Sequence, residues 1–149
     1  MSKYEKIEIK RELFYYSVII KNTDKDLSDI IENYDIEQIY KISIVGDLED
    51  KNDILSQCVN LQELTLKYCN NIEDIPDTLI NLKNLNIMYC EHINNITNNL
   101  RILLCKNIDL LFFITHRDII KKDINEFFPL SRKGLIIIGD DLKKKYKFN

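Results

Sequence analysis

The feature that most constrains this chain is an apolar pattern in residues 61–96 that recurs after 21 residues. When Leu61 is laid over Leu82, the segment matches itself at nearly every apolar position, whereas the polar residues between the matches change freely. The matching pairs are Leu61 and Leu82, Leu64 and Leu85, Leu66 and Ile87, Cys69 and Cys90, and Ile72 and Ile93. A chain that keeps its apolar residues and varies the others is maintaining a core, and here the core recurs with a short period.

The shared pattern, L-x-x-L-x-L-x-x-C, resembles the leucine-rich repeat, in which the first six positions form a short strand and the ninth ends it. Leu64 and Leu66 are two residues apart, so both point to one face of a strand while Thr65 points to the other. Cys69 is small enough for a buried turn, where its S–H group can donate to backbone carbonyls. The resemblance implies an α/β solenoid with parallel strands on the concave face, and short helices, 3₁₀ turns and loops on the convex face.

The whole chain is interpreted as a single leucine-rich-repeat domain over residues 1–149. Residues 1–12 are predicted to be an N-terminal cap strand, because the first turn of a solenoid needs its open core face covered. Repeats are expected from about residue 15 to 134. A C-terminal strand and a basic tail are expected over residues 135–149.

Within the repeats, residues 24–34 have Leu27, Ile30 and Ile31 at helical spacing, which predicts a short helix on the convex side. In the next repeat, Asp47 replaces the cysteine of the turn. Further on, Pro76 is placed where a short helix or 3₁₀ turn can begin, since proline is well tolerated at that position.

The pattern is least regular after residue 100. The next match places Leu111 and Phe113 in the core, which leaves Phe112 on the outward face of a strand that is apolar on both sides. An exposed apolar row of this kind usually marks a contact. The candidates for its cover are the segment 118–128, which has a helical pattern, a second chain and a partner, and we favour a partner contact or self-association.

Charge and hydropathy exclude several classes of function. The net charge of −3 argues against a general nucleic-acid binder, which would carry a basic surplus. The first residues, MSKYEKIEIKRE, are charged throughout and predict no secretory signal peptide. The longest apolar run, residues 100–114, is too short and too charged to cross a membrane. We therefore expect a cytoplasmic protein whose partners include neither nucleic acid nor membrane.

No residues are assigned to catalysis, a cofactor or a metal. The chain has four cysteines without a C-x-x-C pair, and Cys90 with His92 is the one close pair of zinc-ligand types, so buried reduced thiols are preferred over zinc. Cys69 and Cys90 on adjacent strands would lie about 5 Å apart, close enough for a disulfide, but reduced thiols are expected in the cytoplasm. No nucleophile–base arrangement or phosphate-binding loop can be assembled, so we expect no enzyme.

The outward strand residues would align on the concave face, which solenoids use to bind extended partners. Tyr68 and Tyr89 occupy the same position in their repeats and would form a ladder that suits an interface. The alternative is that the two rings only shield the turn. The residues predicted to bind a partner are Ser43, Val45, Thr65, Lys67, Tyr68, Asn86, Met88, Tyr89 and Phe112.

The sequence therefore predicts a non-enzymatic module that binds another protein through its concave face. The alternative is a structural subunit that forms a homodimer through its apolar C-terminal repeats. The cysteine-bearing repeats also resemble those of F-box proteins, which implies a substrate adaptor of a ubiquitin ligase, although nothing in the chain resembles an F-box. The Ile- and Asn-rich, alanine-free composition is similar to that of small leucine-rich-repeat proteins of large DNA viruses such as poxviruses, which would make the partner a host protein.

Overall fold

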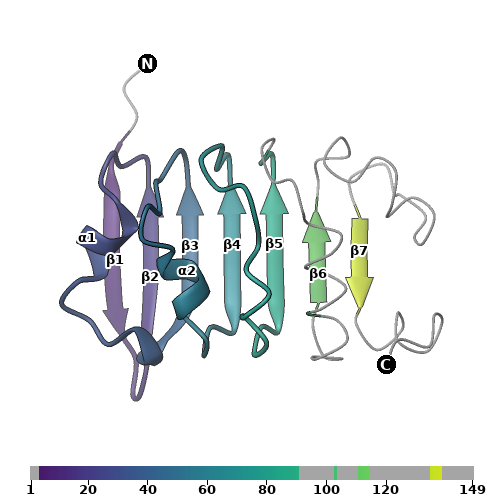
Figure 1. Cartoon of the computed structure of the whole chain (residues 1–149), viewed down its shortest axis with the longest axis horizontal. Helices are drawn as coiled ribbons and strands as arrows, with labels where there is room; N and C mark the ends of the chain where they lie inside the picture. The colour runs from purple at the N-terminus through teal and green to yellow at the C-terminus, as the bar shows by residue number, and fades with distance from the viewer. Residues whose placement is uncertain (1–3, 91–102, 104–110, 115–134, 139–149) are drawn as a thin grey trace.

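The computed structural model describes residues 4–90, 103, 111–114 and 135–138. It is a mixed α/β structure in which seven strands form one sheet in sequence order (Figure 1). The strands are β1 (Lys6–Arg11), β2 (Tyr16–Lys21), β3 (Ile39–Val45), β4 (Glu63–Lys67), β5 (Asn84–Met88), β6 (Leu111–Ile114) and β7 (Leu135–Ile138). The helical segments are α1 (Leu27–Ile31), the 3₁₀ segment η1 (Ile36–Gln38) and α2 (Ile54–Gln57).

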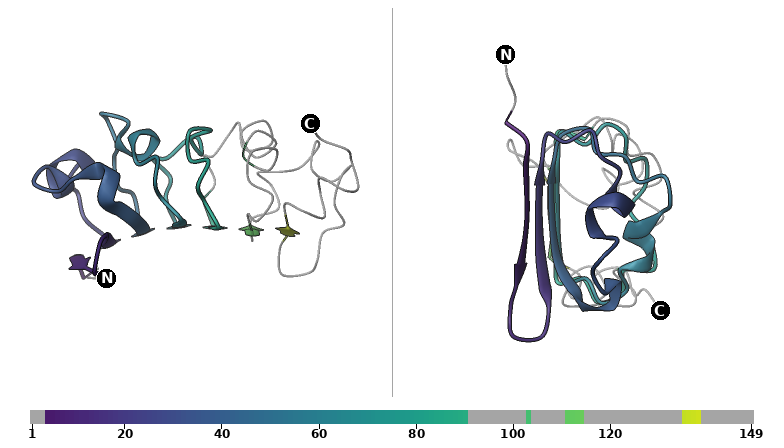
Figure 2. Two further views of the ribbon diagram at one scale, coloured as in Figure 1. Left: turned by 90° about the horizontal axis from the view of Figure 1, so that it is seen from below. Right: turned by 90° about the vertical axis from the view of Figure 1, so that its left-hand side faces the viewer.

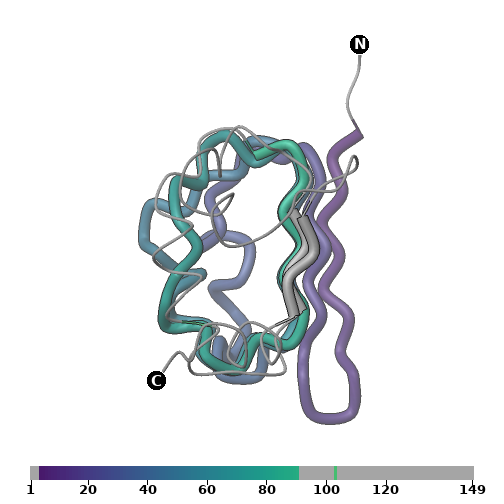
Figure 3. Tube along the Cα trace, turned by 90° about the vertical axis from the view of Figure 1, so that its right-hand side faces the viewer, coloured from purple at the N-terminus to yellow at the C-terminus, as the bar shows by residue number. Residues whose placement is uncertain are grey.

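Strands β2 to β6 pair in parallel, and an antiparallel pair lies at each end of the sheet, β1 with β2 and β6 with β7. In the centre, Lys41 pairs with Glu63, and Glu63 pairs with Asn84. The described connections between parallel strands all lie on one side of the sheet (Figure 2). Viewed along the row of strands, they follow nearly the same loop, while β1 stands outside it (Figure 3).

The predicted register of the two matching segments is confirmed. Leu64 pairs with Leu85 and Leu66 pairs with Ile87, and all four side chains are buried. Their strands alternate between buried and half-buried residues, as expected for a sheet with one face on the core. Complete burial of a leucine or isoleucine side chain is worth roughly 1.5–3 kcal/mol, so this alternation strongly favours one register over a slipped one.

The core fills the space between the sheet and the connections. It is built from Ile, Leu, Val and Cys side chains of the strands and of the segments that fold back over them. The connections contribute Leu27, Ile31, Leu48, Ile54, Leu55, Cys58, Ile72, Ile75 and Leu79. One layer of strands and one layer of short helices and loops therefore enclose a single apolar interior.

The helix predicted in residues 24–34 is present as α1, and its apolar residues Leu27 and Ile31 are buried. Asp26 caps its N-terminus because its carboxylate accepts the backbone N–H of Ser28 at 3.0 Å. The other oxygen of Asp26 accepts the N–H of Lys51 at 3.0 Å, which joins two successive connections. Burial would raise the pKa of Asp26, but these N–H donors outweigh it and lower the pKa.

The turn predicted to begin at Pro76, in the connection after β4, is present as a single turn with the i to i+3 hydrogen bond that is typical of a 3₁₀ turn. No helix is described there, and Pro76 begins a turn in which its carbonyl accepts the N–H of Leu79 at 3.4 Å. The Thr78 hydroxyl donates to the carbonyl of Ser56 at 2.6 Å, and the Asn81 amide donates to the carbonyl of Val59 at 2.8 Å. Side-chain bonds to the preceding connection thus hold this segment in an extended path.

The N-terminal strand β1 pairs antiparallel with β2 and closes the edge of the sheet. Most of its residues are exposed, and Ile9 packs against the buried cluster. The segment predicted as a cap thus satisfies the free hydrogen-bonding groups of β2, which would otherwise invite pairing with another chain.

The frame predicted for Leu111 and Phe113 is wrong by one residue. The sheet pairs Phe112 with Leu85 and Ile114 with Ile87, so these two residues occupy the register positions of buried side chains. The physical reason is that a strand that is apolar at every position carries no alternation to identify its inner face. The predicted helix at 118–128 lies outside the described residues.

Candidate interaction surface

The side of strands β1 to β5 that faces away from the connections is called here the exposed sheet face. Its side chains are half-buried or exposed, and the register aligns them in rows across the strands. The rows from β2 to β5 are Ser17, Lys41, Glu63 and Asn84; Ile19, Ser43, Thr65 and Asn86; and Lys21, Val45, Lys67 and Met88.

The structure brings together on this face all of the predicted partner-binding residues except Phe112. Ser43, Thr65 and Asn86 form the middle row, which is small and polar. Val45, Lys67 and Met88 form the row at the C-terminal ends of the strands, beside the two tyrosines. Phe112 belongs to β6 and pairs with Leu85, whose own side chain is buried.

The two predicted tyrosines stack on each other at the ends of their strands. The ring centroids of Tyr68 and Tyr89 are 5.2 Å apart and the ring planes differ by 12°. Their side chains stay exposed, at 50% and 46% respectively. The ladder expected from the sequence is therefore present, and it presents aromatic area to solvent.

Both tyrosines adopt a left-handed backbone conformation, with φ of 56° for Tyr68 and 55° for Tyr89. The residues that directly follow β2 and β3, Asn22 and Gly46, also have positive φ, of 53° and 104°. This conformation costs a bulky residue roughly 1–2 kcal/mol. The sequence did not predict this conformation at Tyr68 and Tyr89, because a left-handed turn residue is typically glycine or asparagine and not tyrosine.

The strand ladder holds these residues in place. The N–H groups of three of them donate to the carbonyl of the last residue of the next strand: Asn22 to Val45 at 2.8 Å, Gly46 to Lys67 at 2.9 Å and Tyr68 to Met88 at 3.0 Å. The neighbouring strand thus holds an exposed aromatic residue, Tyr68, in an unfavourable backbone conformation. Such strain is concentrated at functional sites, which supports a functional role for this position.

The buried cysteine turns confirm the prediction for the ninth position. The thiol of Cys69 donates to the carbonyls of Ile44 and Lys67 at 3.4 Å each, and that of Cys90 to the carbonyl of Met88 at 3.5 Å. The Cys69 N–H donates to the Cys90 sulfur at 3.4 Å. Hydrogen bonding between the two thiols and burial raise the pKa of Cys69, while the same hydrogen bond lowers the pKa of Cys90.

The lysines of the exposed sheet face differ in their surroundings. Lys41 forms an ion pair with Glu63 at 3.0 Å, and this hydrogen-bonded neighbour raises the pKa of Lys41. The ammonium of Lys67 lies 5.6 Å from the ring centroid of Tyr68. Within the described residues, neither Lys21 nor Lys67 takes part in an ion pair.

Sequence reasoning missed the part of the face contributed by β2. Ile19 and Lys21 extend the rows toward β1, and Tyr15 stacks on Tyr40 with centroids 4.9 Å apart. A shallow hollow of about 170 Å³ lies between Ile19 and Thr65, floored by the middle row. The alternation of residues in β2 could have identified Ile19 and Lys21 as outward residues.

On the opposite side of the molecule, a hollow of about 580 Å³ is lined by acidic residues of two connections, including Asp50, Asp53, Glu73, Asp74 and Asp77. Among the described residues, no three metal-ligand side chains converge on a common point. None of the described helices has the length and apolar character needed to cross a membrane. Comparison with known protein families, with curated proteins and with solved structures finds no match.

Proposed function

We propose that this protein is a leucine-rich-repeat solenoid that binds another protein through its exposed sheet face and performs no catalysis. Three regularities support the repeat. The parallel strands follow one another in sequence order, the connections return on one side, and a positive φ ends each of β2, β3, β4 and β5. Such an arrangement suits a quasi-linear stack that offers an extended sheet for binding.

The observation that carries the binding function is the stacked, exposed pair Tyr68 and Tyr89. Aromatic rings that are half exposed, locked in place and stacked lose little conformational freedom on binding, and tyrosine is enriched at energetically dominant interface positions. The alternative, that they merely shield the turn, accounts less well for their position. Shielding of the turn does not require that about half of each ring stay exposed to solvent.

The neighbouring rows suit a bound protein segment. Ser43, Thr65 and Asn86 have short polar side chains, so a chain can approach the strands closely and form hydrogen bonds. Val45 and Met88 add apolar contact area. These side chains offer area and hydrogen bonds rather than a nucleophile with a base, which favours recognition over catalysis.

The free thiols bear on the proposed cytoplasmic location. Cys58, Cys69 and Cys90 are all buried and unbridged. The hydrogen bonds of Cys69 and Cys90 use their thiol protons, which a disulfide would remove. A reducing compartment therefore suits this core best.

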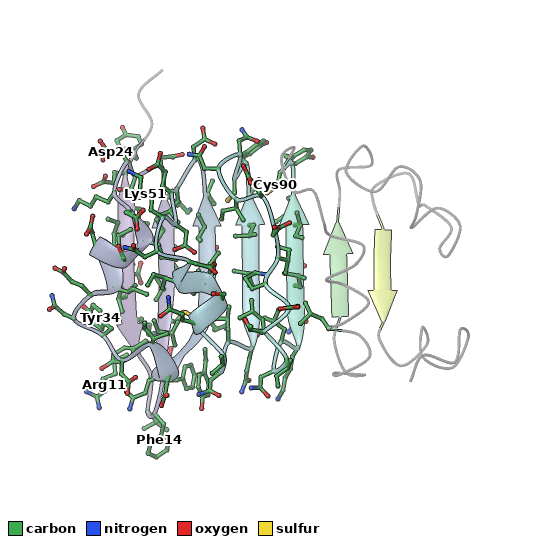
Figure 4. All side chains as sticks on the ribbon, in the orientation of Figure 1. Arg11, Phe14, Asp24, Tyr34, Lys51 and Cys90 are labelled. Atoms are coloured by element: carbon green, nitrogen blue, oxygen red, sulfur yellow. The ribbon has the colours of Figure 1, made fainter. Side chains whose placement is uncertain are left out.

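The proposal is tested by quantitative affinity capture from cells that express the protein. A partner that binds the exposed sheet face should be captured by the wild type and lost from a Tyr68→Ala/Tyr89→Ala variant. The matched control is Leu13→Ala/Phe14→Ala, which removes two exposed apolar side chains at the tip of the β1–β2 hairpin (Figure 4). A partner that the tyrosine variant retains would contradict the proposal, provided that circular dichroism shows both variants folded.

A second candidate function, self-association, is favoured by the apolar sequences of β6 and β7, LFFI and LIII. A strand that is apolar at every position needs cover on both faces, and a second copy of the chain can supply it. Sedimentation velocity at several concentrations separates the two functions, since a dimer at micromolar concentration favours self-association. The viral origin and the ubiquitin-ligase adaptor role stay predictions from the sequence.

A further inference from the structure

We infer that the segment bound by the exposed sheet face is a short acidic stretch of the partner protein, held by Lys21 and Lys67. This inference rests on the proposed function and specifies the chemistry of the partner. It follows from the distribution of charge between the two sides of the sheet and from the surroundings of the individual lysines.

Charge is segregated between the strands and the connections. Strands β1 to β5 contain six basic and two acidic residues, whereas the connections 22–38, 46–62 and 68–83 contain thirteen acidic and three basic residues. The net charge of −3 for the whole chain conceals this division. An acidic partner is therefore attracted to the sheet and repelled by the opposite side, which both speeds and orients its encounter.

The ion pairs show which basic side chains of the strands remain available to an acidic partner. Three of the six form ion pairs that compensate their charges locally: Lys6 with Glu8 at 3.1 Å, Lys10 with Glu12 at 3.7 Å and Lys41 with Glu63 at 3.0 Å. Arg11 lies over the ring of Tyr16, 5.9 Å from its centroid, and alternation along β1 places it on the side opposite to Lys6 and Lys10. Within the described residues, Lys21 and Lys67 form no ion pair. They occupy one row, with Val45 between them, so their Cα atoms lie about 10 Å apart at the usual strand spacing.

The geometry of that row suits a short peptide segment. The ammonium groups on both sides of Val45 can each meet a carboxylate, and an apolar side chain between them can rest on Val45. Tyr68 and Tyr89 offer a stacked surface for a further apolar or aromatic residue. Across its seven strands the sheet measures about 29 Å by about 17 Å, below the roughly 800 Å² that each partner buries in a standard interface. A segment fits this area better than a globular surface.

Nucleic acid and anionic membranes also carry negative charge, but the surroundings disfavour them. Asp47 is exposed immediately beyond the end of β3, and the acidic connections follow behind the strand ends. A long polyanion that extends beyond the lysine row meets these carboxylates, whereas a short acidic segment does not. The observations therefore favour a protein segment.

The test is a selection from a displayed library of random 12-residue peptides on the immobilised full chain. It is repeated with Lys21→Glu/Lys67→Glu, and with the matched control Lys25→Glu/Lys51→Glu, which changes the net charge equally on exposed residues of the connections. Peptides selected by the wild type and the control should be at least twofold enriched in Asp and Glu over the input. The Lys21/Lys67 variant should lose this enrichment.

The affinities of the best peptides are then measured by fluorescence anisotropy. Lys21→Glu/Lys67→Glu should weaken binding at least tenfold, and the control variant less than twofold. Selected peptides without acidic enrichment, or an unchanged affinity in the Lys21/Lys67 variant, would overturn the inference. It would also fail if a single-stranded 12-nucleotide oligonucleotide or phosphatidylserine vesicles bound these lysines more tightly than the peptides.

The same selection distinguishes failure of this inference from failure of the proposed function. If the selected peptides are neutral or basic but lose affinity in Tyr68→Ala/Tyr89→Ala, the exposed sheet face binds protein and the acidic chemistry is wrong. If they bind independently of both the tyrosines and the lysines, the proposed function fails as well. Circular dichroism establishes that each variant is folded before its result is interpreted.

Discussion

The two faces of the central sheet belong to the same strands but are under different physical constraints. On the inner face, Leu64 and Leu66 pair with Leu85 and Ile87 and are all buried. On the outer face, the residue between Leu64 and Leu66 is Thr65, and its neighbour across the sheet is Asn86. Close packing restricts the inner positions to branched apolar side chains, whereas solvent admits many types outside.

This difference shows where function can be encoded. Positions that must fill a core have little freedom to evolve recognition. The outer rows and the strand ends are free of that constraint. The strained tyrosines lie there, as do the two lysines that have no ion pair among the described residues. Substitutions on the inner face, at the strand ends and on the outer face test this difference.

The largest loss of stability is expected on the inner face. Leu64→Ala and Leu85→Ala should each lower the free energy of unfolding by about 2–5 kcal/mol, because each leaves a cavity among fully buried side chains. Urea unfolding followed by circular dichroism measures this change. A cost below about 0.5 kcal/mol for either variant would show that its side chain is not in the core.

A buried thiol on the connection side should make the protein sensitive to alkaline pH. Burial, with a contribution from Asp50, raises the pKa of Cys58 from 9.0 to about 12. Below pH 9 both the folded and unfolded thiols are protonated and pH has no effect through this group. Above pH 9 the unfolded thiol ionises first, so the free energy of unfolding falls by about 1.4 kcal/mol per pH unit until about pH 12.

The control for this effect is Cys58→Ala, measured over the same pH range. The stability advantage of the wild type over the variant should shrink as pH rises above 9, since the variant has no thiol to ionise. A difference that stays constant up to pH 11 would show that this thiol ionises equally well in the folded protein.

Among the residues with positive φ at the strand ends, glycine and tyrosine should respond differently to substitution. Gly46→Ala should cost about 1–3 kcal/mol, because φ is 104° and the added Cβ would meet the side-chain oxygen of Asn22 at 3.0 Å. Tyr68→Gly should leave stability nearly unchanged, since relief of strain offsets the lost stacking. Thermal unfolding of both variants provides the test, and equal losses would contradict this view of the turns.

The smallest effect is expected on the outer face. Glu63→Ala and Asn84→Ala should each change stability by less than about 0.5 kcal/mol, although the first breaks the ion pair with Lys41. Both side chains of that pair are more than 40% exposed, and exposed ion pairs contribute little. If these variants were costlier than Leu64→Ala in the same urea experiment, the assignment of inner and outer faces would be reversed.

The sequence by itself determined the elements in which buried apolar residues recur at a regular spacing. The recurrence of leucines and cysteines predicted the pairing of Leu64 with Leu85 and the buried turns of Cys69 and Cys90. Helical spacing predicted α1. Removal of apolar side chains from water dominates these choices, and it leaves a regular pattern in the order of residues. The outer positions of β3, β4 and β5 followed from the same alternation.

Only the tertiary structure decided the features that depend on neighbouring strands. Phe112 lies in a segment without alternation, so only the pairing of β6 with β5 set its register opposite Leu85. Tyr68 is held in its left-handed conformation by a hydrogen bond to Met88, 20 residues away in sequence. The alternation in β2 marks Lys21 as an outward residue, but only the pairing of β2 with β3 and of β3 with β4 placed it in one row with Val45 and Lys67. Backbone pairing between distant segments leaves no local periodic signal, so it could be read only from the folded chain.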